Sequence, residues 1–303
     1  MIFVAASAQR VVVIINPISG TGGRPEIARQ RVELASAILR ARGDDASLLV
    51  TEYAGHARHL VRGALQNQAA LVMAWGGDGT VNEIASELVF RDVAFAIIPS
   101  GSGNGLAREL GIPFDPAAAF QVAFEGHDRV IDAGELDGHL FFNIAGLGLD
   151  ARIAHEFASN GLVRRGFARY LEIAARELFT FVPEAHTILT DGVARPTRAL
   201  LIALANGRQY GNNACIAPGA RLDDGKLDVV VVEYRSPVAS LLQAPMVFAG
   251  GVARLPGVTI TPAAEVEITS ARPVLYHVDG EPFAGGASVK AHVHPHALRV
   301  RVP

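Results

Sequence analysis

Cysteine is almost missing from this chain of 303 residues, in which Cys215 is the single one. One thiol excludes an intrachain disulfide and leaves a metal–thiolate site without a second ligand. No apolar run approaches the roughly 20 residues that a membrane-spanning helix needs, and the N-terminus lacks the basic, apolar and cleavage regions of a signal peptide. We therefore expect a soluble, intracellular protein.

Concentrated basic charge is also missing. Half of the residues are hydrophobic, 19% are charged, and the formal net charge is −3. The sequence has no basic stripe of the kind that binds nucleic acid, so we expect no nucleic-acid partner. It has no polybasic membrane anchor either, and any contact with a bilayer must be local and weak. The apolar content suffices for well-packed cores, and the length favours two domains.

The first 125 or so residues alternate between strand and helix patterns. Strands are predicted at residues 10–15, 46–51, 70–74 and 95–98, and helices at 24–42, 57–67, 81–88, around Leu106 and at 117–124. Such alternation predicts a parallel sheet covered by helices on both faces, which is a doubly wound α/β domain. Ligands of these sheets bind at the carboxyl ends of the strands.

Short apolar runs separated by turn signals follow residue 126. They predict strands at 130–136, 140–149, 186–189, 199–205, 227–233, 266–269, 274–278 and 288–294, interrupted by helices at 167–179 and 237–248. This rhythm is typical of an antiparallel sandwich or barrel. We place the boundary near residues 126–130, with an α/β domain of residues 1–128 and a β-rich domain of residues 129–294. The tail, 295–303, is a candidate last strand that returns to the first domain.

Three glycine-rich stretches, at residues 16–23, 75–83 and 99–105, each follow a predicted strand. Glycine permits a tight bend and a close approach to a ligand, and free amides at a helix start favour phosphate. Three such loops at one sheet edge favour a shared nucleotide cleft over unrelated turns. Asp78 suggests Mg²⁺ between its carboxylate and a polyphosphate, or else it caps the next helix. Asn16 either donates to a phosphate or holds its loop.

Six motifs occur in the order of the diacylglycerol kinase catalytic family, which includes bacterial diacylglycerol and other lipid kinases, sphingosine kinases and ceramide kinase. The resemblance covers nearly the whole chain. It rests on Asn-Pro-Ile-Ser-Gly at 16–20, Gly-Gly-Asp-Gly-Thr-Val-Asn-Glu at 76–83, Pro-Ser-Gly-Ser-Gly-Asn at 99–104, Asn-Ile-Ala-Gly-Leu-Gly-Leu-Asp at 143–150, Leu-Asp-Asp-Gly-Lys-Leu-Asp at 222–228 and Asp-Gly-Glu at 279–281. Gly105 stands where many bacterial members carry an acidic residue, so the third motif is more similar to the sphingosine and ceramide kinase branch.

The resemblance implies an ATP- and Mg²⁺-dependent kinase that transfers the γ-phosphoryl group to a lipid hydroxyl, such as that of diacylglycerol, a sphingoid base or a related lipid. It implies a nucleotide-binding α/β domain similar to those of NAD kinases and phosphofructokinases. This domain would be joined to a C-terminal antiparallel β-sandwich that binds the lipid, with the active site in the cleft between the two.

The resemblance also implies roles for individual residues. ATP would contact Asn16, Thr51, Gly76, Gly77, Asp78, Gly79, Thr80, Val81, Asn82 and Ser102. Glu281 matches the proton acceptor, and Asp78 would hold the metal–phosphate assembly. The Asp224 side chain and the carbonyls of Arg221 and Lys226 match a second, structural Mg²⁺ site of the bacterial members. A carboxylate near the acceptor hydroxyl suits phosphoryl transfer, which needs positioning and charge neutralisation more than covalent catalysis.

Plainer interpretations stay open for several of these residues. Asp-Gly at 279–280, between two strands, and Asp-Asp-Gly at 223–225 are also ordinary turn signals. Asn143 and Asp150 either line a lipid entrance or cap a turn. Arginines at 164, 165, 169 and 176 fit a basic helix resting on a membrane or a solvated helix face, and we favour the second.

Four histidines invite a metal interpretation. Strand alternation places His292, His294 and His296 on one face, but the sequence shows no nearby carboxylate or cysteine that would complete a site. We therefore interpret them, together with His277, as exposed strand histidines.

The resulting hypothesis is a cytoplasmic lipid kinase that contacts the membrane surface transiently. Its expected partners are the lipid substrate and a second copy of the chain in a homodimer. The alternatives are a kinase for a soluble alcohol or for NAD, and a nucleotide-binding regulator without catalysis. The presence of both Asp78 and Glu281 argues against the regulator.

Overall fold

The computed structural model describes residues 10–20, 24–43, 45–159, 167–211 and 214–303, without the side chains of residues 167–170. Gly22 and Gly23 of the first glycine-rich stretch thus lie outside the described residues. The chain divides into two compact units. One comprises the described residues up to Gly101, with Gly111–Arg129 and Leu298–Pro303, and the other comprises Ser102–Leu110 and Val130–Ala297.

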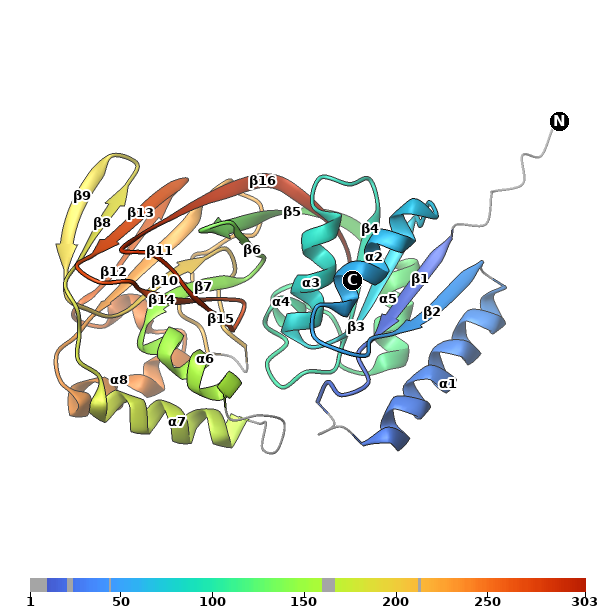
Figure 1. Cartoon of the computed structure of the whole chain (residues 1–303), viewed down its shortest axis with the longest axis horizontal. Helices are drawn as coiled ribbons and strands as arrows, with labels where there is room; N and C mark the ends of the chain where they lie inside the picture. Colours follow the sequence, from blue (N-terminus) through green and yellow to red (C-terminus); the bar gives the residue numbers. More distant parts are fainter. Residues whose placement is uncertain (1–9, 21–23, 44, 160–166, 212–213) are drawn as a thin grey trace. The chain divides into compact units, whose positions relative to one another are not determined.

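The N-terminal unit is built on a parallel sheet in the order β2-β1-β3-β4 (Figure 1). Its strands are β1 (Val11–Ile15), β2 (Ala46–Val50), β3 (Leu71–Gly76) and β4 (Ala94–Pro99). Every residue of β1, β3 and β4 is buried, as expected for parallel strands covered on both faces. The predicted α/β class of this region is confirmed.

Four helices pack on this sheet: α1 (Pro25–Arg42), α2 (His56–Gln66), α3 (Asp78–Leu88) and α5 (Pro116–Glu125). Pro25 begins α1, and Gly43 ends it in the left-handed region at φ +72°. Asp115 caps α5 by accepting a hydrogen bond from the amide of Ala118. The helix boundaries therefore follow from local sequence signals.

The C-terminal unit contains an antiparallel six-stranded sheet in the order β12-β11-β10-β7-β14-β15. These strands are β12 (Val258–Ala263), β11 (Leu227–Glu233), β10 (Ala199–Ala205), β7 (Ile144–Gly148), β14 (Leu275–Val278) and β15 (Glu281–Ala284). A second group of strands runs in the order β16-β13-β8-β9, with β5 also paired to β16 and β6 paired to β5. Its members are β16 (Ser288–Val302), β13 (Glu265–Ser270), β8 (His186–Thr190), β9 (Val193–Thr197), β5 (His127–Leu136) and β6 (His139–Phe141).

One apolar cluster fills the space between the two groups of strands. It joins Leu204 and Tyr276 of the six-stranded sheet to Ile188, Ile268 and Val289 of the second group. Side chains from two facing sheets that share one core define a β-sandwich. The predicted sandwich is confirmed.

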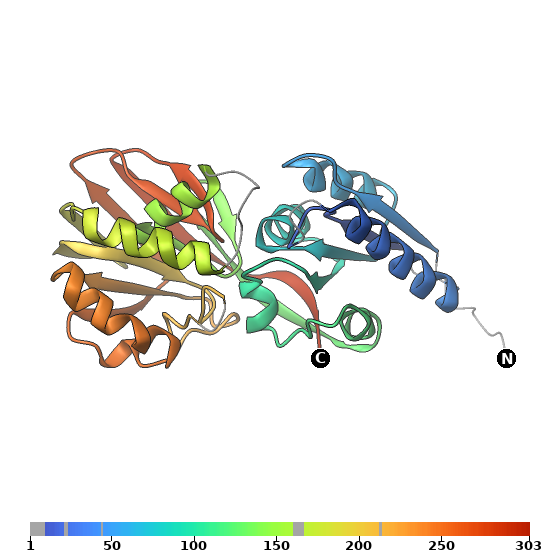
Figure 2. The same cartoon turned by 90° about the horizontal axis from the view of Figure 1, so that it is seen from below.

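Helices of the C-terminal unit are α4 (Gly105–Glu109), α6 (Leu149–Ser159), α7 (Phe167–Thr180), α8 (Pro237–Phe248) and the 3₁₀ helix η2 (Val252–Arg254). Figures 1 and 2 show α6, α7 and α8 gathered on one side of the strands, where α6 packs on α7 and on β14 and β15. Ile153, Ile173 and Leu178 form the buried seam between α6 and α7. In the described part of the chain, no helix combines the length and the apolar character needed to cross a bilayer.

The structure differs from the sequence prediction at several elements. The run at 140–149, predicted as one strand, contains part of β6, then β7, and the start of α6. Gly148 ends β7 at φ +94°, where a Cβ would lie 2.6 Å from the carbonyl oxygen of Leu200. Strands β9, β12 and β15 and helix α6 were not predicted.

The tail forms the end of β16, whose Val300 pairs in parallel with Phe95 of β4. It is continuous with the strand predicted at 288–294. The tail is therefore a last strand that joins the sheet of the N-terminal unit.

Candidate active site

The first glycine-rich loop begins at Asn16, directly after β1. The Asn16 side-chain amide donates to Oγ1 of Thr80 at 2.8 Å, and its Oδ1 accepts from the amide of Ile18 at 3.1 Å. Asn16 thus holds its loop and joins it to the second glycine-rich loop, and its contact with a phosphate stays a prediction. Thr80, Val81 and Asn82 of that second loop are buried, and the amide of Val81 donates to the carbonyl of Gly77 at 3.0 Å.

The three glycine-rich loops come together at the carboxyl edge of the N-terminal sheet. A Cβ on Gly77 would lie 3.0 Å from Cα of Gly101 and 3.1 Å from Oγ of Ser19. A Cβ on Gly20, which has φ +66°, would overlap the carbonyl oxygen of Ser100. Side chains at these positions are excluded by the neighbouring loops. The glycines are therefore required for the loops to converge at the edge where a nucleotide is expected.

Arg31 of α1 binds the backbone of the first glycine-rich loop. It was not predicted as a site residue. It is buried, and its guanidinium donates to the carbonyl oxygens of Asn16 at 2.9 Å and Ser19 at 2.8 Å. Burial lowers the pKa of Arg31 from its ordinary value. The sequence carried one signal, because Arg31 occupies the same helical stripe as Ala35 and Leu39, both of which are buried. A cation within an apolar stripe needs polar partners, and the loop carbonyls are those partners.

Asp78 is the first residue of α3 and is partly buried. The N-cap residue of the helix is Gly77, which has no side chain, and Asp78 lies one position further on, in the first turn. The alternative interpretation of Asp78 as a helix cap is therefore wrong. Thr51, another predicted nucleotide contact, follows β2 and donates its amide to the carbonyl of Ile15 at 2.9 Å. Asn16, Thr51 and Asp78 all lie just beyond the carboxyl ends of parallel strands.

The segment 279–281 forms the tight turn of the β14–β15 hairpin in the C-terminal unit. Asp279 and Gly280 have φ +47° and +86°, so the hairpin interpretation of this segment is confirmed. The Asp279 carboxylate accepts from the amides of Phe142, Asn143 and Ile144 at 3.0, 3.0 and 3.1 Å. These bonds fix the turn that carries the exposed Glu281. A hairpin turn and a fixed position for a catalytic carboxylate are compatible.

His277 lies behind this turn in a buried polar cluster, so its prediction as an exposed strand histidine is wrong. Its Nδ1 accepts from the amide of Gly280 at 3.3 Å, which leaves the proton on Nε2 to donate to Oδ2 of Asp150 at 3.3 Å. The Tyr210 hydroxyl donates to the same carboxylate oxygen at 2.9 Å. His277 and Asp150 are buried because α6 covers this face of β14. They orient the hairpin turn from within the unit.

Asn143 is also buried, and its side-chain amide donates to the carbonyl of Gln209 at 2.7 Å. Asp150 accepts from the amide of Ala151, in the first turn of α6, at 2.8 Å. Asp150 thus contacts the first turn of its own helix and Asn143 a distant backbone carbonyl, and a place for either at a lipid entrance stays a prediction.

The segment 221–226 is a turn held by a buried carboxylate that sequence reasoning missed. Asp132, which is fully buried, accepts from the amides of Gly225 at 2.7 Å and His296 at 2.8 Å. Oδ1 of Asp224 accepts from the amide of Lys226 at 3.1 Å, as in an ordinary turn. The signal for Asp132 is a carboxylate directly after Val130 and Ile131 in the run at 130–136, because a buried charge requires nearby donors.

This turn gathers negative charge that suits a hard cation. Asp228, the second residue of β11, is partly buried, and its pKa is raised first by burial and then by the charge of Asp224. Carboxylate and carbonyl oxygens are the ligands that Mg²⁺ prefers. The residues present therefore fit the structural Mg²⁺ site that the family resemblance implies.

Comparison with known proteins identifies the family. Residues 10–136 match the model of the diacylglycerol kinase catalytic domain, and residues 143–302 match that of the YegS C-terminal NAD kinase beta sandwich-like domain. The chain belongs to the diacylglycerol kinase and YegS family of lipid kinases. Kinases of this family use ATP, so the convergent glycine-rich loops occur in a chain whose family binds a nucleotide.

Two relatives match the chain over nearly its whole length. The chain is 31% identical to a Mycobacterium tuberculosis (strain H37Rv) protein named "Diacylglycerol kinase", over 97% of this chain and 95% of that protein. It is 30% identical to the "Probable lipid kinase YegS-like" of Klebsiella pneumoniae (strain 342), over 94% of both chains. The crystal structure of a diacylglycerol kinase from Bacillus anthracis str. Sterne has the same fold, with a TM-score of 0.73 at 20% identity over 99% of this chain and 98% of that one.

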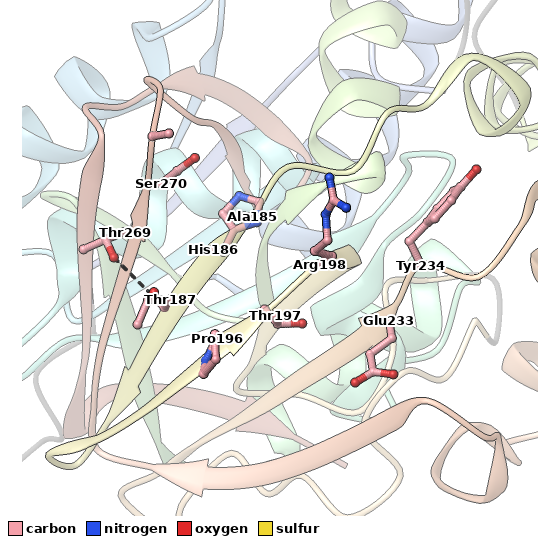
Figure 3. A pocket seen from close by; sticks show the side chains of 11 residues that line it. Ala185, His186, Thr187, Pro196, Thr197, Arg198, Glu233, Tyr234, Thr269 and Ser270 are labelled. Carbon is pink, nitrogen blue, oxygen red and sulfur yellow. Dashed lines mark hydrogen bonds between the residues drawn. The ribbon is translucent and has the colours of Figure 1, made fainter.

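The C-terminal unit also has a cavity away from the predicted site residues. It measures about 550 Å³ and is lined by the ends of β8, β9, β11 and β13 (Figure 3). Its described lining includes none of the residues that the family motifs single out. The Nδ1 atom of His186 and the Oγ1 atom of Thr197, both on its wall, are buried without a protein hydrogen-bond partner in the described structure. Thr269 donates weakly to the carbonyl of Thr187, its partner on the paired strand β8, at 3.4 Å.

The raised pKa of Asp228 predicts that the stability of the folded chain depends on pH. The raised pKa means that the folded chain binds the proton of Asp228 more tightly than the unfolded chain does. The resulting stabilisation is present below the unfolded-state pKa and is lost as pH rises through the folded-state pKa, so the ionised carboxylate disfavours folding at neutral pH. We expect Asp228→Asn to raise Tm by roughly 1–3 °C at pH 7.5 without divalent cations, as measured by calorimetry. A Tm that falls, or that stays the same, would contradict this electrostatic account.

Proposed function

We propose that this protein is an ATP- and Mg²⁺-dependent kinase that transfers the γ-phosphoryl group to a lipid hydroxyl. The observation that carries the proposal is the convergence of three glycine-rich loops at the carboxyl edge of the N-terminal sheet, with Asp78 in the first turn of α3. The positive end of the α3 helix dipole favours phosphate there. The buried charge of Arg31 beneath the first loop adds to the attraction.

In this proposal the nucleotide contacts Asn16, Thr51, Ser102 and the loop from Gly76 to Asn82. Mg²⁺ would neutralise charge on the β- and γ-phosphates, with Asp78 holding the metal–phosphate assembly directly or through water. The second Mg²⁺ site would use the Asp224 side chain and the carbonyls of Arg221 and Lys226. Support for it comes from the turn held by Asp132 and from the clustered carboxylates of Asp224 and Asp228.

Glu281 is the proposed general base that accepts the proton of the lipid hydroxyl. Two features support it: the side chain is exposed, and its hairpin turn is held by the three amide bonds to Asp279 and by His277. A fixed carboxylate within hydrogen-bond reach of an acceptor hydroxyl can remove its proton as the oxygen attacks. We assign residues 1–128 as the nucleotide-binding domain and 129–294 as the lipid-substrate domain.

An apolar surface on α8 supports transient contact between a cytoplasmic kinase and a bilayer. The twelve residues of α8 carry no charge, and none of them is buried among the described residues. Val238, Leu241, Leu242 and Phe248 are exposed, Leu242 by 76%. Leaving such side chains in water is unfavourable, and a kinase whose acceptor lies in a bilayer has a partner that covers them. We therefore propose that this α8 surface rests on the lipid surface.

The basic-helix alternative gains little support from the described residues. Arg164 and Arg165 lie outside them, as does the side chain of Arg169. Arg176 pairs with Glu156 at 3.0 Å and with Glu177 at 3.3 Å. The proposed membrane contact thus rests on the exposed apolar side chains of α8.

Leu242 tests the α8 surface. We expect Leu242→Glu to weaken binding to vesicles by about tenfold or more, because burying one leucine side chain contributes roughly 1.5–3 kcal/mol. Sedimentation with phosphatidylcholine vesicles that also contain anionic lipid, as cytoplasmic leaflets do, measures the binding. Leu34→Glu, at an exposed leucine of α1, is the matched control and should bind like wild type. Equal binding by the Leu242 and Leu34 variants would remove the α8 surface from the proposal.

The proposed function is tested by offering lipid and soluble acceptors side by side. Wild-type protein, MgCl₂ and γ-labelled ATP are incubated with vesicles containing diacylglycerol or a sphingoid base, and separately with glycerol or NAD. We expect label in the lipid fraction alone. Label transferred to a soluble acceptor but to no lipid would overturn the lipid assignment in favour of a soluble-alcohol or NAD kinase. ATP binding without transfer to any acceptor would favour a regulator.

A further inference from the structure

Three potential metal ligands converge on paired strands of the C-terminal unit. His292 and His294 are two residues apart on β16, and Glu135 lies on β5, which pairs with β16. Oε2 of Glu135 is 2.8 Å from Nε2 of His294 and 3.6 Å from Nε2 of His292. All three ligand atoms lie within 4.8 Å of one another. The sequence interpretation that no carboxylate accompanies these histidines is therefore wrong.

His296 does not share this arrangement, although strand alternation predicted that it would. Its φ of +53° breaks the regular strand geometry, and its amide donates to Asp132. Regular alternation holds only while φ and ψ stay extended, so the face assignment ends at His294.

We propose that Glu135, His292 and His294 bind a divalent transition-metal ion, with Zn²⁺ as the best fit. Two imidazoles and one carboxylate form a ligand set that Zn²⁺ accepts, whereas Mg²⁺ and Ca²⁺ prefer oxygen ligands throughout. Ligand atoms about 2.0–2.1 Å from a tetrahedral zinc lie about 3.3–3.4 Å apart. The separations of 2.8 and 3.6 Å from Glu135 bracket that spacing, so small side-chain rotations suffice to admit the ion.

The partial exposure of the three side chains also suits an exchangeable ion. The side chains of Glu135 and His294 are 27% and 24% exposed, and that of His292 is 43% exposed. Three protein ligands leave a coordination position for water.

The site is separate from the proposed Mg²⁺ turn, because Asp132 and Glu135 are three residues apart on β5 and strand alternation directs them to opposite faces.

An ion bound here would tie β5 to β16. Because binding to the folded chain alone stabilises it by mass action, Zn²⁺ should raise Tm in a concentration-dependent way. The cluster is thus a structural or regulatory metal site that stands apart from phosphoryl transfer.

Calorimetric titration of ZnCl₂ into the chelator-stripped full chain tests the proposal, with MgCl₂ in excess to occupy oxygen-rich sites. We expect one binding event that is weakened by about tenfold or more in His294→Ala and in Glu135→Gln. His127→Ala, at an exposed histidine elsewhere on β5, should bind like wild type. Thermal melts without metal establish that each variant folds, and His294→Gln replaces His294→Ala if the latter does not.

Cobalt supplies an independent signature. Co²⁺ bound to the wild-type cluster should give visible d–d absorption bands that disappear in the His294 variant and persist in His127→Ala. No Zn²⁺ binding by the wild type, or equal Zn²⁺ affinity and equal Co²⁺ spectra in the wild type and the His294 and Glu135 variants, would overturn the proposal.

Discussion

Replacing Glu281 by glutamine should lower kcat for lipid phosphorylation by about 10²–10⁴-fold while leaving ATP affinity within about twofold of wild type. Glutamine has the shape of glutamate but cannot accept the proton of the acceptor hydroxyl. The hairpin turn itself should persist, because Asp279 and His277 hold it rather than Glu281. Steady-state kinetics on vesicles and a separate nucleotide-binding titration measure the two effects.

Glu265→Gln is a suitable control for this variant, since Glu265 is an exposed carboxylate on a strand of the same unit. It should retain wild-type kcat. A Glu281→Gln variant that binds ATP and turns over at the wild-type rate would show that another group takes the proton.

Replacing Asp78 by asparagine should abolish Mg²⁺-dependent turnover, with a loss of about 10²-fold or more, because the carboxylate is the proposed partner of the metal–phosphate assembly. The fold should be retained. The loop conformation depends on glycines packed against Ser19, Ser100 and Gly101, and removing one acidic charge from a first helical turn costs about 1 kcal/mol or less. Turnover is measured as a function of MgCl₂ concentration, and Tm by calorimetry.

Glu26→Gln matches this change at another first helical turn, since Glu26 occupies the first turn of α1. It should reproduce the small dipole effect on Tm without loss of turnover. If Asp78→Asn kept both the wild-type rate and the wild-type Mg²⁺ midpoint, Asp78 would have no part in holding the metal–phosphate assembly.

The architecture of the N-terminal unit was accessible from the sequence because its signals are local. Buried parallel strands appear as apolar runs, and glycine-rich segments directly after them mark the carboxyl edge. The convergence of the loops follows from the parallel order of β1, β3 and β4. Arg31 was missed because helical periodicity identifies a buried stripe but does not show which polar groups face a cation within it.

The C-terminal unit was harder to predict because its polar contacts join residues far apart in the sequence. His277 sits in an alternating strand, and only the packing of α6 over β14 makes that face buried. Glu135 reaches His294 through the pairing of β5 with β16, a register that no local pattern specifies. Asp132 was detectable in principle as a charge within an apolar run, but its partners at Gly225 and His296 were not.

The α6 helix was missed for a different reason. Apolar residues continue from β7 into the first turn of α6, so the apolar run at 140–149 does not show where the strand ends and the helix begins. The change from strand to helix depends on Gly148, whose positive φ is a backbone property that the residue type permits but does not demand.

The central claim is that this chain phosphorylates a lipid with ATP. Its most direct test is incubation of the wild-type protein, MgCl₂ and γ-labelled ATP with total extracted lipids, followed by mass identification of any labelled product. The account predicts a labelled lipid heavier than its precursor by one phosphoryl group, formed by wild type and formed at least about 10²-fold more slowly by Glu281→Gln. Labelled lipid formed equally by both proteins would contradict the assigned base, and no labelled lipid from wild-type protein that binds ATP would contradict the central claim itself.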